Sequence, residues 1–157
     1  MAERQVRPEP TDADAALARK LLAKADAAML AVVADGSPYA ALTAHAVAGD
    51  GAPLILTSAL GAHGRALSDD GRASLLLAGP VDPSKPLAGP RLTIVGRAEP
   101  AVDGDREAYL ARRPEAELFI DFGDMTLHRV QPESLQLIVG FGRAVSLPPE
   151  ALRVTNT

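Results

Sequence analysis

The sequence predicts a mainly β domain with peripheral helices, of the α+β class, whose strands pair antiparallel. Two observations support this prediction. Asp35-Gly36 and Asp50-Gly51 separate apolar runs, and both residue types tolerate the positive φ that a tight hairpin turn requires. Residues 91–98 alternate between polar and apolar side chains, which is typical of a strand with one buried face. Strands joined by tight turns pair antiparallel, so a closed or half-open barrel is favoured over a parallel sheet.

The remaining elements follow in chain order from local signals. Thr11 and Asp14 form a capping pattern, and apolar residues recur at helical spacing after it, which predicts a helix over residues 12–26. Apolar runs predict strands over residues 28–34, 38–47, 53–57, 72–78, 91–98, 125–130 and 135–139. Shorter helices are expected over residues 62–67, 103–112 and 115–122. Three prolines predict a loop over residues 79–89, and Pro132-Glu133 is expected to join the last two strands.

Length and composition indicate one globular domain. The chain has 157 residues, of which 47% are apolar and 23% charged, enough to bury a sizeable core. We expect a flexible N-terminal tail over residues 1–10, the folded domain over residues 11–147 and a C-terminal tail over residues 148–157.

Charge and composition disfavour several classes of protein. Sixteen Lys and Arg against 20 Asp and Glu give a net charge of −4, which argues against nucleic acid or an anionic membrane as a partner. The absence of Cys excludes disulfides, thiol nucleophiles and iron–sulfur ligation. The longest clean apolar run, residues 27–34, is too short to span a bilayer. We expect a cytoplasmic protein that acts on a small molecule, whose identity the sequence does not give.

Residues 54–67 carry the strongest chemical signal. The expected strand ends in Thr57 and Ser58, and the chain then turns through Gly61 into a helix with His63 and Arg65. Hydroxyls, the N–H groups of a helix start and a nearby guanidinium are what a phosphate group needs. Arg91 would add a third cation if the barrel places it close to His63 and Arg65. In the alternative interpretation, Ser58 caps the helix while the imidazole and guanidinium point into water.

Other catalytic chemistries have weaker support. His45, His63 and His128 do not have the spacing of metal ligands, so no metal site is expected. A nucleophilic triad has its residue types in Ser58, His63 and Asp69 or Asp70. The serine lacks the first glycine of a nucleophile elbow, so the sharp turn that exposes a nucleophile is not signalled.

Three carboxylates offer a further alternative. Glu117, Asp121 and Asp124 would share one helical face if the helix ran that far, either as an acid/base pair or as a solvated acidic surface. Gly140-Phe141-Gly142 lacks the third glycine of a dinucleotide-binding loop, so a bend at a strand end is the preferred interpretation.

The chain resembles a known family over residues 15–147. The shared motifs are Gly36-Ser37-Pro38-Tyr39, Ser58-Ala59-Leu60 followed by His63 and Leu67, Asp70-Gly71-Arg72-Ala73-Ser74-Leu75, Pro90-Arg91-Leu92-Thr93-Ile94-Val95-Gly96-Arg97-Ala98, Tyr109-Leu110 with Pro114-Glu115-Ala116, Phe122-Gly123-Asp124-Met125 and Val139-Gly140-Phe141-Gly142-Arg143-Ala144. In this order they resemble the pyridoxamine 5'-phosphate oxidase-related FMN-binding split barrels, and within them the haem-utilisation-like branch.

This resemblance implies an antiparallel split β-barrel that forms a homodimer and holds FMN at the subunit interface. It also implies that the flavin rests against the backbone of the second strand, while the phosphate is held at the end of the third strand and at the start of the next helix. The corresponding residues here are Ala41, Leu42, Thr43, Thr57, Ser58, His63 and Arg65, with Arg91 as an addition.

Three functions are therefore weighed. The first is an FMN-dependent oxidoreductase. The second is a haem- or tetrapyrrole-binding or regulatory protein that has lost or weakened flavin binding, with His45 and His128 as candidate axial ligands. This second candidate is based on Gly64 and Ala66, which occupy positions where the haem-utilisation-like branch has polar residues. The third is acid–base hydrolysis by Glu117, Asp121 or His63, which no motif supports.

Overall fold

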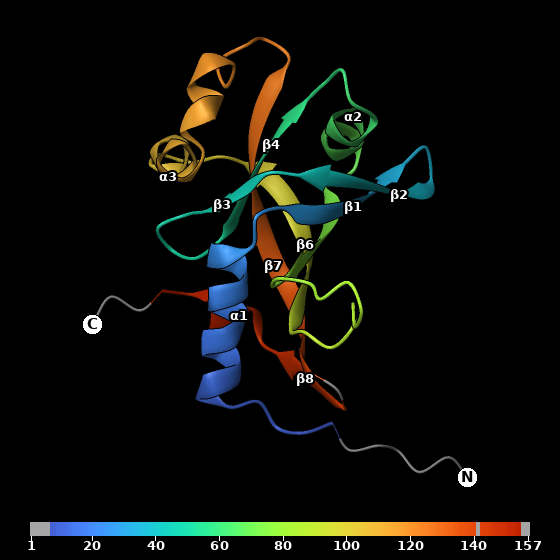
Figure 1. The fold of residues 1–157 in the computed structure, drawn as a ribbon. Helices are drawn as coiled ribbons and strands as arrows, with labels where there is room; N and C mark the ends of the chain where they lie inside the picture. The colour runs from blue at the N-terminus through green and yellow to red at the C-terminus, as the bar shows by residue number, and fades with distance from the viewer. Residues whose placement is uncertain (1–6, 141, 155–157) are drawn as a thin grey trace.

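The computed structural model describes residues 7–140 and 142–154 and contains one sheet with helices packed around it (Figure 1). Its strands are β1 (Ala28–Ala34), β2 (Ser37–Thr43), β3 (His45–Val47), β4 (Pro53–Ser58), β5 (Arg72–Ala78), β6 (Arg91–Pro100), β7 (Met125–Gly140) and β8 (Arg143–Leu147). Its helices are α1 (Asp12–Lys24), α2 (Ala62–Asp69) and α3 (Asp105–Arg112), with 3-10 turns η1 (Pro114–Leu118) and η2 (Pro149–Leu152).

The order of the strands shows how the sheet curls. It runs β2-β1-β5-β6-β7-β4-β3, with β8 added to the far part of β7, and every pair is antiparallel. The two end strands, β2 and β3, are consecutive in the chain and separated by Ala44 alone. The sheet must therefore bend round until its two ends meet. This makes the curled half-barrel that the sequence predicts.

The core lies between the concave face of the sheet and α1. Leu30 of β1, Leu75 of β5 and Ile94 of β6 are fully buried on this inner face, and Leu22 of α1 covers them. The capping box of Thr11 and Asp14 starts α1 as predicted. A second apolar cluster lies under α3 and η1.

Several predictions are confirmed. The strands over residues 28–34 and 72–78 have the predicted bounds. Asp35 and Gly36 both have positive φ, at 51° and 76°, as the predicted hairpin turn requires. The prediction of antiparallel strands around short helices is confirmed as well.

Three predicted elements were wrong. Residues 38–47 form two strands, because the backbone leaves the first pairing at Ala44. Residues 125–140 form one continuous strand, β7, and Pro132 is accommodated where the pairing with β6 shifts beside Gly96. The helix expected over residues 115–122 is a 3-10 turn that ends at Leu118.

After β7 the structure contains elements that the sequence did not predict. Strand β8 was not expected, and it pairs with β7 immediately after the bend near Gly142. Within residues 148–154, η2 packs against α1 and buries Leu152. Much of the predicted N-terminal tail lies outside the described residues.

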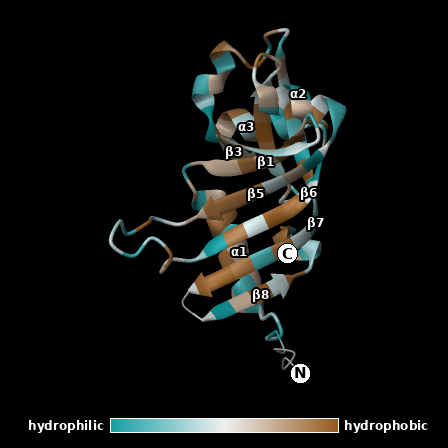
Figure 2. Ribbon diagram, turned by 90° about the vertical axis from the view of Figure 1, so that its right-hand side faces the viewer, coloured by the Kyte–Doolittle hydropathy of each residue, from teal (hydrophilic) through white to brown (hydrophobic). Residues whose placement is uncertain are grey.

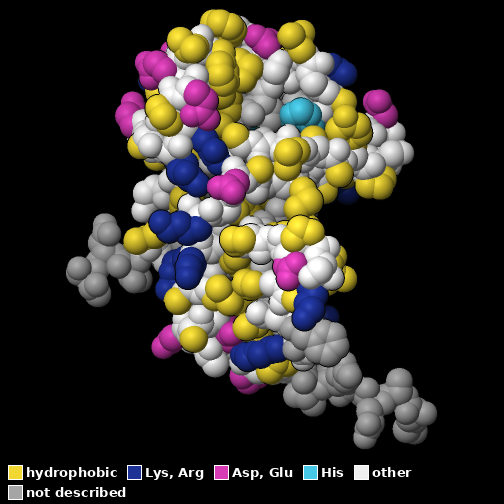
Figure 3. All heavy atoms as spheres, in the orientation of Figure 1, with side chains coloured by type: hydrophobic (Ala, Val, Ile, Leu, Met, Phe, Trp, Pro, Cys, Tyr) yellow, Lys and Arg dark blue, Asp and Glu magenta, His cyan; other side chains and the backbone are white. Residues whose placement is uncertain are grey.

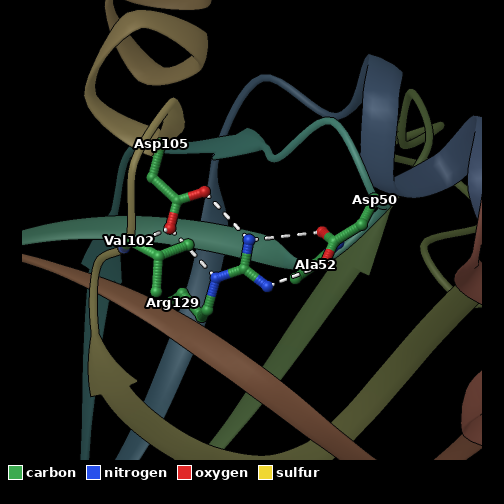
Figure 4. Close-up of polar contacts among 5 residues, drawn as sticks. All are labelled: Asp50, Ala52, Val102, Asp105 and Arg129. Atoms are coloured by element: carbon green, nitrogen blue, oxygen red, sulfur yellow. Dashed lines mark hydrogen bonds and ion pairs between the residues drawn. The ribbon is translucent and has the colours of Figure 1, made fainter.

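One ion network joins three segments outside the core (Figure 4). The Arg129 guanidinium of β7 donates two hydrogen bonds to Asp105, at 3.0 and 2.9 Å, and two to Asp50, at 2.7 and 3.3 Å. Asp105 is only 2% exposed and begins α3, while Asp50 belongs to the turn between β3 and β4. The network fixes α3 and this turn onto β7.

Removing the guanidinium should therefore destabilise the fold. Arg129→Met leaves the buried Asp105 carboxylate without its partner, so we expect the free energy of unfolding to fall by about 3 kcal/mol in urea titrations. The matched control is Arg106→Met, which breaks the exposed Arg106–Asp121 pair and should lower the free energy of unfolding far less, because water screens an exposed ion pair. Equal losses for the two variants would contradict this assignment.

Candidate functional site

The end of β4 and the start of α2 are in direct contact. The chain turns through Gly61 into α2, close to the predicted helix start. A Cβ atom on Gly64 would lie 2.0 Å from the Ser58 carbonyl oxygen, so only glycine allows this approach. The polar residue that the resemblance suggested at this position would not fit. The α2 helix also contacts β1 and β2, which brings the β1–β2 hairpin beside the strand end.

Both hydroxyls at the end of β4 have partners within the protein. The Thr57 hydroxyl is buried and shares a hydrogen bond of 3.0 Å with Nε2 of His128. The Ser58 hydroxyl donates to the Asp124 carboxylate at 2.5 Å and accepts the Leu60 N–H at 3.0 Å. Ser58 thus ties the loop after β4 to the start of β7. Asp124 could not be assigned from sequence because the contact spans 66 residues.

The start of α2 keeps its N–H groups available. No side chain caps this helix and no acidic residue lies in its first turn. The first N–H groups of a helix have no intrahelical acceptor, so they favour an anion. The His63 ring is half-buried and lies against Gly61. The Arg65 guanidinium is exposed and donates to the carbonyls of Ala59 and Leu60 at 3.1 and 2.8 Å.

The second strand offers its backbone. Among the described strands, β2 pairs only with β1, so one edge of the strand carrying Ala41, Leu42 and Thr43 has no strand beside it. Leu42 is 74% exposed and Ala41 half-buried, while the Thr43 side chain is buried and its hydroxyl donates to the carbonyl of Ala44. An unpaired strand edge supplies hydrogen-bond donors and acceptors to a ligand.

Arg91 does not join these residues within one chain. It begins β6 opposite Ile138, whereas Ser58 lies opposite Met125 at the other end of β7. The Arg91 guanidinium donates to the carbonyls of Leu87 and Gly89. A second copy of the chain would have to supply this cation.

The structure does not bring the candidate acid–base residues into a catalytic arrangement. The three carboxylates do not share a helical face, because the 3-10 turn that carries Glu117 ends before the other two. Asp121 pairs with Arg106, and Asp124 accepts from Ser58. The Ser58 hydroxyl donates to this carboxylate and not to the His63 ring, so the nucleophilic triad that was considered as an alternative is not assembled.

His45 and His128 are not placed as axial ligands. They are 1% and 6% exposed. Nε2 of His45 donates to the Leu22 carbonyl at 2.8 Å, and its buried Nδ1 finds no partner among the described residues. A flat macrocycle could reach neither ring from the surface, so this prediction is corrected. Burial lowers the pKa of both rings below the usual imidazole value.

A cleft adjoins the candidate site. It has a volume of about 440 Å³ and opens between the β1–β2 hairpin and α2. Its charged lining residues are Asp35, Arg65, Asp69, Asp70 and Arg72.

At the upper end of the molecule, hydrophobic side chains reach the surface (Figure 3). Leu60 is 81% exposed and Phe122 is 60% exposed, and they lie on the two loops that Ser58 joins.

The comparison with protein families identifies the fold family. Residues 15–138 match the family model of pyridoxamine 5'-phosphate oxidase. The chain belongs to this family. The match covers the half-barrel from α1 to most of β7, including the end of β4, α2 and the strand edge described above. The split-barrel architecture suggested by the sequence motifs is therefore confirmed.

Similar proteins within the fold carry haem-related names. A chloroplastic protein of Arabidopsis thaliana, named non-canonical heme oxygenase HOZ, is 32% identical over 114 residues, which are 70% of this chain and 34% of the plant protein. The chain thus spans about a third of that relative. A heme binding protein from Mycobacterium smegmatis is 31% identical with a TM-score of 0.82, covering 92% of this chain and 61% of the other. HutZ from Vibrio cholerae, a heme storage protein, shares the fold at 23% identity and a TM-score of 0.59, with coverages of 86% and 96%.

Within the described ranges, no helix has both the length and the apolar character needed to cross a membrane.

The buried imidazoles predict a specific pH dependence. An unfolded chain takes up protons on both rings near pH 6.5, whereas in the folded protein they resist protonation, so the free energy of unfolding should fall as the pH drops below about 6.5. Each ring contributes up to about 1.4 kcal/mol per pH unit between its folded and unfolded pKa. We expect the free energy of unfolding, measured by urea titration at each pH from 7 to 5, to depend less steeply on pH in the double variant His45→Gln/His128→Gln than in the wild type. An unchanged slope would contradict the assignment.

Proposed function

We propose that this protein binds FMN and uses it in an oxidoreductase reaction on a small molecule, at the interface of a homodimer. The observation that carries the proposal is that α2, whose start has no side-chain cap, contacts β2, which pairs only with β1 among the described strands, in a chain of the pyridoxamine 5'-phosphate oxidase family. These two features suit the two ends of FMN, a phosphate and a planar ring with polar edges. We also propose that the protein is cytoplasmic.

The phosphate end would meet the first turn of α2. The N–H groups of this turn have no side-chain cap and the His63 ring lies next to them, whereas the Ser58 hydroxyl is committed to Asp124. Arg65 donates hydrogen bonds to the carbonyls of Ala59 and Leu60, so it stabilises the loop between β4 and α2 and adds positive charge next to that loop. The buried Thr57 hydroxyl and the Ser58 hydroxyl support the loop from within.

The ring end would lie along β2. The outer edge of Ala41–Thr43 presents alternating N–H and C=O groups that can pair with the polar edge of an isoalloxazine. When bound, FMN supplies hydride or electron transfer, and the protein orients it and excludes water. Arg91 of a second copy is the candidate for a further cation.

Haem binding is the second candidate function. The observation in its favour is that two proteins more than 30% identical to this chain carry haem-related names. Because His45 and His128 are buried, the half-buried His63 is the imidazole left for an axial ligand. A haem titration that leaves the Soret band of free haem unshifted would remove this candidate.

A charge placed at the helix start tests FMN binding. Ala62→Asp puts a carboxylate into the first turn of α2, where it favours the helix but repels a phosphate, so the FMN dissociation constant should rise by about tenfold. Ala62→Asn has nearly the same size without the charge and is the matched control. Flavin fluorescence quenching measures both, and riboflavin, which lacks the phosphate, should not distinguish the two variants.

Failure of the proposal has a clear form. If the wild-type protein stays colourless after incubation with excess FMN and desalting, FMN binding is excluded. If FMN binds but Ala62→Asp and Ala62→Asn bind it equally well, the phosphate does not lie at α2.

A further inference from the structure

The segment between α3 and β7 exposes an apolar patch at the upper end of the molecule. We call Leu118, Phe119 and Phe122 the end patch, and these side chains are 80%, 37% and 60% exposed. Figure 2 shows this segment above α3, with hydrophobic residues next to hydrophilic ones. The chain has only three Phe, two Tyr and no Trp, and two of the three Phe belong to the end patch. Neighbouring large apolar side chains at a protein surface are typical of an interaction site.

The backbone holds the end patch in a fixed shape. Ala116 and Ile120 are buried in the apolar cluster under α3 and anchor the segment. The N–H groups of Phe119 and Ile120 donate to the Ala116 carbonyl at 3.0 and 2.8 Å. The Phe122 N–H donates to the Phe119 carbonyl at 3.0 Å, which closes a turn that keeps the two phenylalanines close together. Because the patch is already ordered, little conformational entropy is lost when a partner binds to it.

Acidic residues accompany the end patch. Residues 101–124 carry seven Asp and Glu against three Arg, a net charge of −4 that equals the net charge of the whole chain. Figure 3 shows acidic and hydrophobic side chains next to each other at this end of the molecule. Glu115 and Glu117 precede Leu118, are exposed, and form no ion pair among the described residues. Their charges are therefore available to a partner.

This combination of charge and apolar surface restricts the partner. The acidic residues would repel an anionic membrane or a nucleic acid. A second copy that packed its own end patch on this one would set like charges against each other. A protein surface with an apolar stripe between basic residues complements both features, and an amphipathic helix with Lys or Arg beside its apolar stripe is such a surface.

We propose that the end patch binds a basic amphipathic helix of another protein. The apolar stripe of that helix would cover Leu118, Phe119 and Phe122, and its cations would face Glu115 and Glu117. This interaction goes beyond the proposed flavin reaction and does not depend on it, because none of these residues is among those proposed to hold FMN.

A designed peptide tests the proposal on the full chain. A helix of Leu and Lys, with Leu at positions i, i+3, i+4 and i+7, carries the required apolar stripe between basic residues. A scrambled peptide of the same composition lacks the stripe, and a helix of Leu and Glu reverses the charge. Fluorescence anisotropy of the labelled peptides should detect binding of the Leu–Lys helix and of neither control.

Variants of the protein then locate the binding surface. Leu118→Ser should raise the dissociation constant of the Leu–Lys helix by about tenfold, because an apolar anchor is lost. Leu87→Ser is the matched control, because Leu87 is 69% exposed on a different loop. Glu117→Lys should raise the constant by about fivefold, whereas Glu133→Lys makes the same change of net charge on β7 and should leave it unchanged. All four substituted residues are exposed, so the fold should be retained.

Several results would overturn the inference. They are no binding of the Leu–Lys helix, equal binding of the scrambled peptide, and equal dissociation constants for Leu118→Ser and Leu87→Ser. If Glu117→Lys binds the helix as tightly as Glu133→Lys, the charge pairing is wrong. If the wild-type protein sediments as an oligomer that Leu118→Ser dissociates, a second copy covers the end patch and the proposed partner is wrong.

Discussion

The single residue between β2 and β3 constrains the whole molecule. Because these two strands are the ends of the sheet and Ala44 alone joins them, the sheet has to close on itself. The junction is fixed on both sides of the backbone. The Arg113 guanidinium donates to the His45 carbonyl at 3.0 Å, and the His45 ring donates to the Leu22 carbonyl of α1 at 2.8 Å. Closure in turn brings the end of β4 beside the first hairpin.

The candidate site is built largely from backbone because its polar side chains serve the fold. Thr57 is committed to His128, Ser58 to Asp124, and Arg65 to two loop carbonyls. What is left for a ligand is a helix start, a strand edge and an apolar face. Recognition by backbone dipoles does not depend on a charged motif, which explains how a strand of near-featureless residues can belong to a binding site.

The strands that local sequence patterns did not predict correctly are stabilised by contacts between residues far apart in the sequence. Pro132 appeared to end a strand, yet β7 continues because the pairing with β6 shifts beside Gly96, where a side chain would collide with the Gln131 carbonyl. The Arg143 guanidinium of the unexpected β8 reaches Asp14 at 2.7 Å across 129 residues. No window of sequence contains both members of either pair, so neither contact could be read from periodicity.

The sequence by itself determined the strands and turns whose signals are local. An apolar run predicted β5 with its observed bounds, Asp35-Gly36 predicted the first turn through positive φ, and ordered motifs indicated the family. Only the tertiary structure decided which side chains meet. It separated Arg91 from Ser58 along the length of β7, buried two of the three imidazoles, and paired Ser58 with a carboxylate. The physical reason is that secondary structure follows from neighbouring residues, whereas a site depends on how the sheet closes.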